Sequence, residues 1–183
     1  GIQLHLAGLS LSDTVSVLAS LGVGRCRSTV HNWVQKANLQ PTEGQNLHYA
    51  AVDETVIHVN DHRYWLFVAV DPDTTCLLHV RLFPTNTQAL TEIFLTELRE
   101  EHLVNDASFW SMVPLAAGGC HRHSLRFQHL THGNLNAVER VFKRLKRGTE
   151  AFANHFRHAR PETGETWLQA FAVYFNQPIW SMT

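Results

Sequence analysis

The sequence lacks several features that would place it outside the cytoplasm. No apolar run approaches the roughly 20 residues that a membrane-spanning helix needs, and no signal peptide opens the chain. Only three cysteines occur in 183 residues, Cys26, Cys76 and Cys120, and they are odd in number and far apart. This pattern argues against a disulfide framework and fits a reducing compartment. We therefore expect a cytoplasmic protein whose three cysteines are buried fillers.

A zinc site is also poorly supported by the cysteine and histidine spacing. Cys120, His121, His123, His129 and His132 occur close together, but their spacing matches no common zinc finger. The first residue is glycine and not an initiating methionine, so we expect further residues upstream.

Charge is scarce overall but strongly segregated. The formal net charge is −1, which excludes no class of partner. Residues 1–41 carry three Lys or Arg and one acid, residues 42–120 carry three and eleven, and residues 121–160 carry nine and two. The acidic middle suits a metal site, and the basic part suits contact with phosphates.

Two acids interrupt an apolar run that otherwise suits a buried strand. Residues 49–57 contain the pair Asp53 and Glu54, and a buried acid requires a compensating interaction or a function. The segments 63–71 and 75–82 resemble two further strands. Residues 87–101 then show apolar residues at helical spacing, with Thr87 as the expected N-cap. The pattern predicts a three-stranded meander covered by a helix.

A later helix sets Glu139 among five cations. The segment 132–147 has an expected apolar stripe at Val138, Phe142 and Leu145. Glu139 on the adjoining face has two interpretations: an ion-pair partner of Lys143, or a ligand of a divalent metal beside a phosphate track. The helix alone favours the ion pair.

The first forty residues have the pattern of a helix-turn-helix. A helix is expected from Ser12, as its cap, to Leu21, and a second from Ser28 to Lys36, with Gly22-Val23-Gly24 between them. Val30, Trp33 and Val34 are expected to pack inward. The outward residues, expected to contact DNA, are Thr29, His31, Asn32, Gln35 and Lys36. We divide the chain into this module at residues 1–40, a linker at 41–46 and a larger domain at 47–183.

Several blocks in order resemble one known family. These are Val52-Asp53-Glu54-Thr55 followed by residues 64–71, then His132-Gly133-Asn134 with residues 136–142, then Lys146, and finally residues 167–171 with Asn176-Gln177. They resemble the DDE transposases of insertion sequences, most closely the archaeal-like members of insertion sequence family six. The resemblance runs nearly end to end.

The resemblance implies an α/β (α+β) fold: a ribonuclease-H-like mixed sheet with flanking helices. It implies two-metal phosphoryl transfer with Mg²⁺ or Mn²⁺, in which Asp53 and Glu139 are the catalytic and metal-binding acids. It also implies a nucleoid-associated homo-oligomer that binds double-stranded DNA, namely terminal inverted repeats and target DNA. Basic residues around the glutamate are expected to contact that DNA: Arg140, Lys143, Arg144, Lys146 and Arg147.

The family's second aspartate has no counterpart here. Met112 stands at the aligned position, about one residue is missing before Cys120, and no acid occurs between Asp106 and Glu139. A one-nucleotide frameshift of a string encoding Leu-Val-Asp-Gly yields Trp-Ser-Met-Val, the residues at 110–113. We hypothesise that an out-of-frame stretch has replaced the aspartate and inactivated this copy. Asp106 lies about 20 Å from Met112 on an extended strand, too far to serve the same metals, and remains a weak third carboxylate.

Two other functions remain open. A non-catalytic DNA-binding remnant could occupy element ends and repress transposition, using residues 1–41 and the basic face. A ribonuclease-H-like nuclease without transposition is disfavoured by the N-terminal module. Metal-dependent cleavage of DNA, or of RNA–DNA hybrid, separates the three.

Overall fold

The computed structural model describes residues 1–37, 39–41, 47–102, 108–111, 126–129, 135–151 and 156–177. The strands are β1 Tyr49–Val59, β2 His62–Val70, β3 Leu77–Phe83, β4 Ser108–Ser111 and β5 Arg126–His129. The helices are α1 Ile2–Leu6, α2 Leu11–Ser20, α3 Arg27–Ala37, α4 Gln88–Glu101, α6 Leu135–Ala151, the 3-10 helix η1 Phe156–His158 and α7 Pro161–Phe175.

The strands form one mixed sheet in the order β3-β2-β1-β4-β5. The first three strands are the expected antiparallel meander, in which Asp53 lies opposite Val68. β4 and β5 pair parallel, with Tyr49–Val52 of β1 aligned on Ser108–Ser111. β1 is thus central. This is the expected ribonuclease-H-like arrangement.

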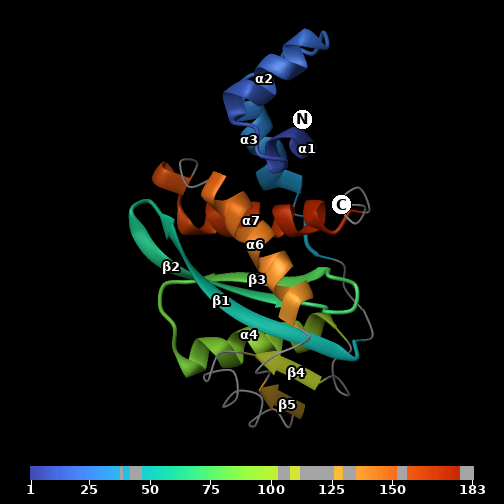
Figure 1. Cartoon of the computed structure of the whole chain (residues 1–183). Helices are drawn as coiled ribbons and strands as arrows, with labels where there is room; N and C mark the ends of the chain where they lie inside the picture. Colours follow the sequence, from blue (N-terminus) through green and yellow to red (C-terminus); the bar gives the residue numbers. More distant parts are fainter. Residues whose placement is uncertain are drawn as a thin grey trace.

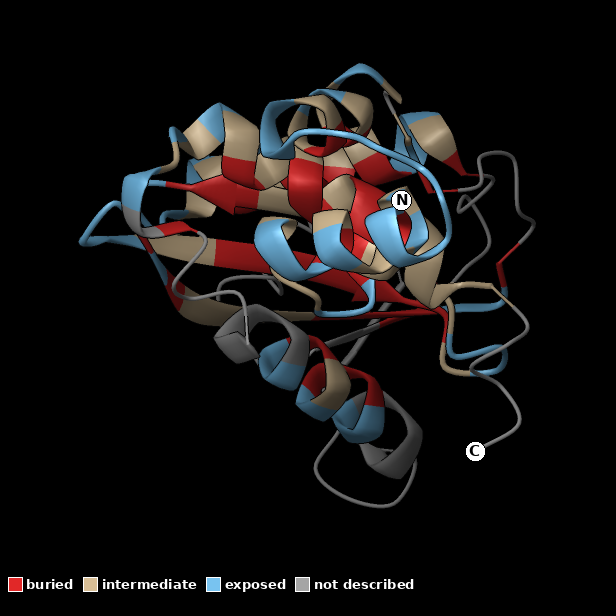
Figure 2. Cartoon of the chain, turned by 90° about the horizontal axis from the view of Figure 1, so that it is seen from above, coloured by how far each residue is buried: buried red, intermediate tan, exposed pale blue. Residues whose placement is uncertain are grey.

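Helices cover both faces of the sheet (Figure 1). One hydrophobic cluster joins the sheet to α6 and α7, and includes Val68, Leu145 and Leu168. A second joins the opposite face to α4 and includes Phe67 and Phe94. Figure 2 shows buried residues along the strands and on the helix faces that meet them. The alternation of side chains along β1 supplies both clusters.

The N-terminus of α4 has the expected capping residue, whereas the cap of α2 differs from the one expected from the sequence. Thr87 caps α4 as expected, because its Oγ1 accepts a hydrogen bond from the Leu90 N–H. The cap of α2 is Ser10, whose Oγ accepts from the Asp13 N–H at 3.0 Å, and not Ser12. Ser10 precedes the expected start by two residues, so Ser12 lies within the first turn.

No helix in the described ranges is long and apolar enough to cross a bilayer.

Candidate active site

Asp53 lies on the central strand and faces the layer formed by α6 and α7. Ala51, Ile57 and Val59, which share its side of β1, all belong to the hydrophobic cluster under these helices. Asp53 itself is half-buried. A carboxylate therefore interrupts an otherwise apolar face, as the sequence predicts.

The surroundings of Asp53 oppose its ionisation on balance. Burial raises the pKa of the Asp53 carboxyl above its ordinary value of 3.8, while the backbone N–H of Glu54 and the charge of Lys146 act in the opposite direction. Desolvation penalises the charged form, and a nearby cation favours it. Lys146 is exposed on α6 and lies close enough for its charge to lower the pKa of Asp53. The structure thus brings Asp53 and Lys146 together.

Glu139 lies on the exposed side of the same helix. Val141, Phe142 and Leu145 of α6 are buried against the sheet, whereas Glu139 is exposed. Phe142 and Leu145 confirm two of the three expected stripe positions, and Val141 adds one that the sequence analysis missed. Glu139 precedes Lys146 by two helical turns, about 10 Å along the axis.

Glu54 points to the opposite side of the sheet and has a partner that the sequence analysis did not identify. Asn86, just before α4, donates a hydrogen bond from Nδ2 to Glu54 Oε1. Glu54 Oε2 and Asn86 Oδ1 are buried without a hydrogen-bond partner among the described residues. Burial raises the pKa of Glu54, the Asn86 bond lowers it, and the Asp53 charge raises it. The sequence analysis recognised the acidic pair but gave Glu54 no role.

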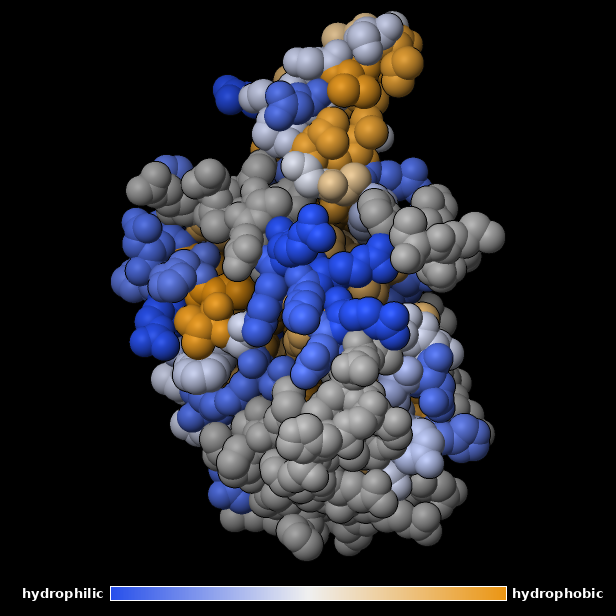
Figure 3. All heavy atoms as spheres, in the orientation of Figure 1, coloured by the Kyte–Doolittle hydropathy of each residue, from blue (hydrophilic) through white to orange (hydrophobic). Residues whose placement is uncertain are grey.

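A basic face extends along α6 beside Glu139. Arg140, Lys143, Lys146 and Arg147 are exposed, and the half-buried Arg144 lies 5.3 Å from the ring centroid of Phe175. Figure 3 shows hydrophilic side chains gathered over the middle of the molecule, where Figure 1 places α6. An exposed cationic helix face of this kind suits contact with phosphates.

In the N-terminal module, only some of the residues that were expected to face outward are exposed. Val30 and Val34 are buried as expected, while Trp33 is half-buried beside Arg25, 6.0 Å from its ring centroid. Asn32 and Lys36 are exposed, and the half-buried Thr29 contacts Cys26.

His31 and Gln35 instead lie against α7. Gln35 Nε2 donates to the Thr163 carbonyl at 3.4 Å, and both side chains line a pocket there. They lie on one face of α3 because they are four residues apart. Periodicity alone does not reveal which face of a short helix docks on another domain.

Some expected residues lie outside the described ranges. These are the linker residues 42–46, Asp106, Met112, Cys120, His121, His123 and His132. The loss of the family's second aspartate therefore remains a prediction from the sequence, as does the expectation that the cysteine–histidine cluster binds no zinc.

The chemistry of Asp53 suits one ligand of a divalent cation. Carboxylate oxygens are the ligands that Mg²⁺ and Mn²⁺ prefer, and a cation beside Asp53 would offset the desolvation that raises its pKa. Among the described residues, no group of three or more His, Cys, Asp and Glu is arranged to hold a metal ion.

Comparison with known proteins gives one curated relative and many similar folds. No protein-family model matches the chain. The uncharacterized protein MJ0017 of Methanocaldococcus jannaschii is 26% identical over 181 residues, covering 94% of this chain and 82% of that protein.

Among solved structures, the catalytic core domain of BIV integrase aligns with a TM-score of 0.54 and 17% identity, over 72% of this chain and 84% of that one. The HTLV-2 integrase catalytic core domain in complex with magnesium aligns with a TM-score of 0.50 and 14% identity, over 72% of this chain and 86% of that one. Together with the strand order, these likenesses show that the chain has the ribonuclease-H-like fold of integrase catalytic cores.

Proposed function

We propose that this chain is a DNA strand-transfer protein, a transposase of an insertion sequence related to family six. The observation that carries the proposal is the position of Asp53. It stands on the central strand of a ribonuclease-H-like sheet and faces the helix that bears Glu139 and Lys146. The likeness to integrase catalytic cores supports the same reaction class, and the sequence blocks quoted above favour the transposase.

Each residue has a defined part in this proposal. Asp53 and Glu139 would hold divalent metal, whose chemistry when bound is to activate a water or 3′-hydroxyl and to stabilise the leaving oxygen. Lys146 supplies a fixed positive charge beside Asp53, where it favours the ionised carboxylate and can pair with a DNA phosphate. Arg140 adjoins Glu139 on the exposed side of α6 and would orient the strand.

The DNA-binding surface in the proposal has two parts. Asn32 and Lys36 offer an exposed edge of α3 for reading terminal inverted repeats, and the basic face of α6 contacts the backbone of double-stranded DNA. Because two element ends must be joined, the working form would be a homo-oligomer.

The direct test is cleavage by the purified chain. The chain is incubated with supercoiled plasmid and with short duplexes containing the candidate element ends, in Mg²⁺ or Mn²⁺. Nicking or joining that is lost in Asp53→Asn and Glu139→Gln supports the proposal. The matched control is Asp73→Asn, which changes an exposed aspartate of the β2–β3 turn and should leave the activity unchanged. Equal activity in Asp53→Asn and wild type would exclude Asp53 as a metal ligand.

A second function, a non-catalytic DNA-binding repressor, has its own support. Among the described residues, no group of three or more His, Cys, Asp and Glu could hold a metal ion, and Met112 stands at the family's aspartate position. Tight binding to element ends without cleavage supports this function.

If the chain binds element ends without cleaving them, restoring the acid tests the frameshift hypothesis. The variant carries Met112→Asp and one residue inserted before Cys120. Recovered metal-dependent cleavage supports a decayed transposase, and continued inactivity of a folded variant counts against it.

A further inference from the structure

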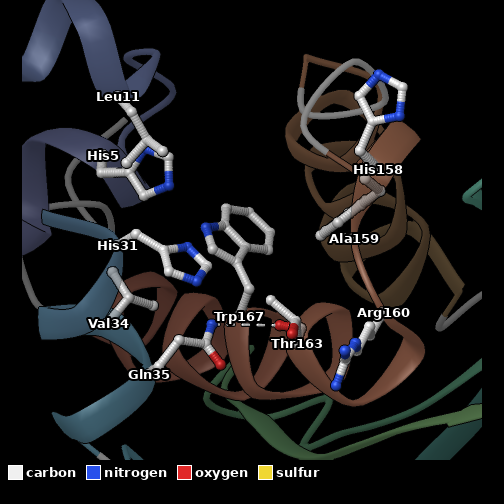
Figure 4. Close-up of a pocket in the computed structure, with 11 residues that line it drawn as sticks. His5, Leu11, His31, Val34, Gln35, His158, Ala159, Arg160, Thr163 and Trp167 are labelled. Atoms are coloured by element: carbon white, nitrogen blue, oxygen red, sulfur yellow. Dashed lines mark hydrogen bonds between the residues drawn. The ribbon is translucent and has the colours of Figure 1, made fainter. Parts of the chain in front are cut away.

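A pocket of about 430 Å³ lies where the N-terminal module meets α7. Figure 4 shows His5 and His31 on one side of it, with His158 and Arg160 on the other. Thr163 and Trp167 of α7 line it between these two groups. The volume is within the range of small-ligand sites, and the proposed catalytic acids do not line it.

The described lining of the pocket combines hydrogen-bond donors with apolar side chains and includes no acid. The imidazoles of His31 and His158, the Arg160 guanidinium, the Gln35 amide and the Thr163 hydroxyl can donate hydrogen bonds, whereas His5 Nδ1 already donates to the Leu9 carbonyl at 2.9 Å. Leu11, Val34 and Phe156 add apolar surface, and no Asp or Glu is among the described residues that line the space. Donors without competing carboxylates favour an anionic ligand.

The arrangement of the donors suggests where the anion sits. His158 and Arg160 are exposed and come from the segment that leads into α7. Arg160 is the N-cap residue of that helix. Its guanidinium is exposed and carries only donors, so it can bind an anion at the helix end where the backbone dipole also favours negative charge.

We propose that this pocket binds one nucleoside phosphate unit of a DNA strand. Arg160 and His158 hold the phosphate, and the sugar and base extend toward Leu11 and Val34. The volume exceeds that of a phosphate alone and so accommodates the attached nucleoside. This inference rests on the proposed DNA-processing function and adds a path for the strand between the module and the catalytic domain. Gln35 and His31, which the sequence analysis assigned to a free helix face, contribute to this site.

The test uses the full chain and two probes, thymidine 5′-monophosphate and a 12-nucleotide single strand. Binding is followed by NMR of the histidine Cε1–H signals, which report directly on His5, His31 and His158. We expect both probes to shift these signals and the strand to displace the mononucleotide. Arg160→Gln should weaken both by about fivefold or more, as expected for loss of a charge-assisted hydrogen bond at an exposed site.

The controls separate the pocket from general charge effects. Arg99→Gln removes one exposed guanidinium from α4 on the other side of the sheet and should change the affinity less than twofold. His158→Gln is a second pocket variant, and thermal melting confirms that each variant is folded. Equal weakening by Arg99→Gln and Arg160→Gln, or unmoved histidine signals, would overturn the proposal. Mononucleotide binding that the strand does not displace would overturn the assignment to DNA.

Cleavage measured on the same samples keeps the two proposals apart. Nucleotide binding that depends on Arg160, in a chain without Asp53-dependent cleavage, supports the pocket and refutes the enzyme. Asp53-dependent cleavage in a chain whose pocket signals do not respond supports the enzyme and overturns the pocket.

Discussion

Asp53 is an ionisable residue in surroundings that disfavour its charged form. Burial raises its pKa despite the counteracting Lys146. An acid whose folded-state pKa is raised adds stability that is fully present below the unfolded-state pKa and is lost as the pH rises through the folded-state pKa. Ionised Asp53 therefore costs stability near neutral pH, which is consistent with a residue kept for function.

The first prediction follows from the stability that ionised Asp53 costs. Asp53→Asn should raise the free energy of unfolding at pH 7, because the amide carries no charge to desolvate, and the gain should shrink toward pH 4. Urea unfolding at both pH values measures it. Mg²⁺ at millimolar concentration should stabilise wild type and not the variant. Asp73→Asn serves as control; a loss of stability in Asp53→Asn at pH 7 would contradict the argument.

Cys26 gives the second prediction and a correction. The sequence analysis expects a buried filler, but Cys26 is exposed, because it directly precedes α3 at the surface turn. Hydrogen bonds with the Ser28 and then the Thr29 hydroxyl lower the pKa of the thiol from 9.0 to about 7. Alkylation of Cys26 by iodoacetamide, followed by mass spectrometry, should therefore show a midpoint near pH 7.

Two serine variants test the cause of this shift. Ser28→Ala should move the midpoint upward, because it removes the larger contribution. Ser16→Ala removes a hydroxyl that bonds to the Ser12 carbonyl within α2 and should not move it. A midpoint near pH 9 in wild type would refute the assignment.

At the scale of elements, α7 protects the free edge of β3. Asn176 Oδ1 accepts from the Leu77 N–H at 2.8 Å, and its Nδ2 donates to the Leu77 carbonyl at 2.7 Å. Glu165 Oε1 accepts from the Leu82 N–H at 3.3 Å. These side chains replace the missing neighbouring strand, which otherwise leaves an edge open to pairing with other molecules.

The third prediction concerns that edge. Asn176→Ala should lower the free energy of unfolding by about 1–3 kcal/mol, because it removes two hydrogen bonds of about 0.5–1.5 kcal/mol each, and should increase aggregation. Urea unfolding and light scattering measure both. Gln177→Ala removes an exposed contact with Gln3 and should cost less than about 0.5 kcal/mol. Equal costs for the two variants would show that the edge contacts contribute little.

The sequence predicts elements well where one physical signal dominates. The alternation and apolar runs gave the meander, and Thr87 gave the start of α4, because these signals are local. Asp53 was recognised because an acid in an apolar strand is conspicuous. The Glu54–Asn86 pair and the bonds of Asn176 were not, because they join residues 32 and 99 positions apart, and neither residue is unusual in its own segment.

At the scale of the molecule, the N-terminal module shares its core with the larger domain. Leu6 and Val34 belong to the same hydrophobic cluster as Trp167 and Phe171. Gln40 also bonds to Gln169 across the junction. The sequence division at residues 41–46 separates two patterns, but the buried side chains on either side of it pack together. We therefore expect the module and the larger domain to unfold as one cooperative unit.

The last prediction tests this coupling. Calorimetry of the full chain should show a single transition, and Val34→Ala should lower its midpoint by about 4–8 °C, because a buried truncation of about 2 kcal/mol moves a protein of this size by that amount. Val34 is 1% exposed, whereas Val23 in the same module is 37% exposed, so Val23→Ala is the matched control and should shift the midpoint little. Two transitions, of which Val34→Ala moves only one, would mean that the module unfolds independently. A single shifted transition would mean that the pocket at this junction is held by the whole fold, as a binding site between the module and α7 requires.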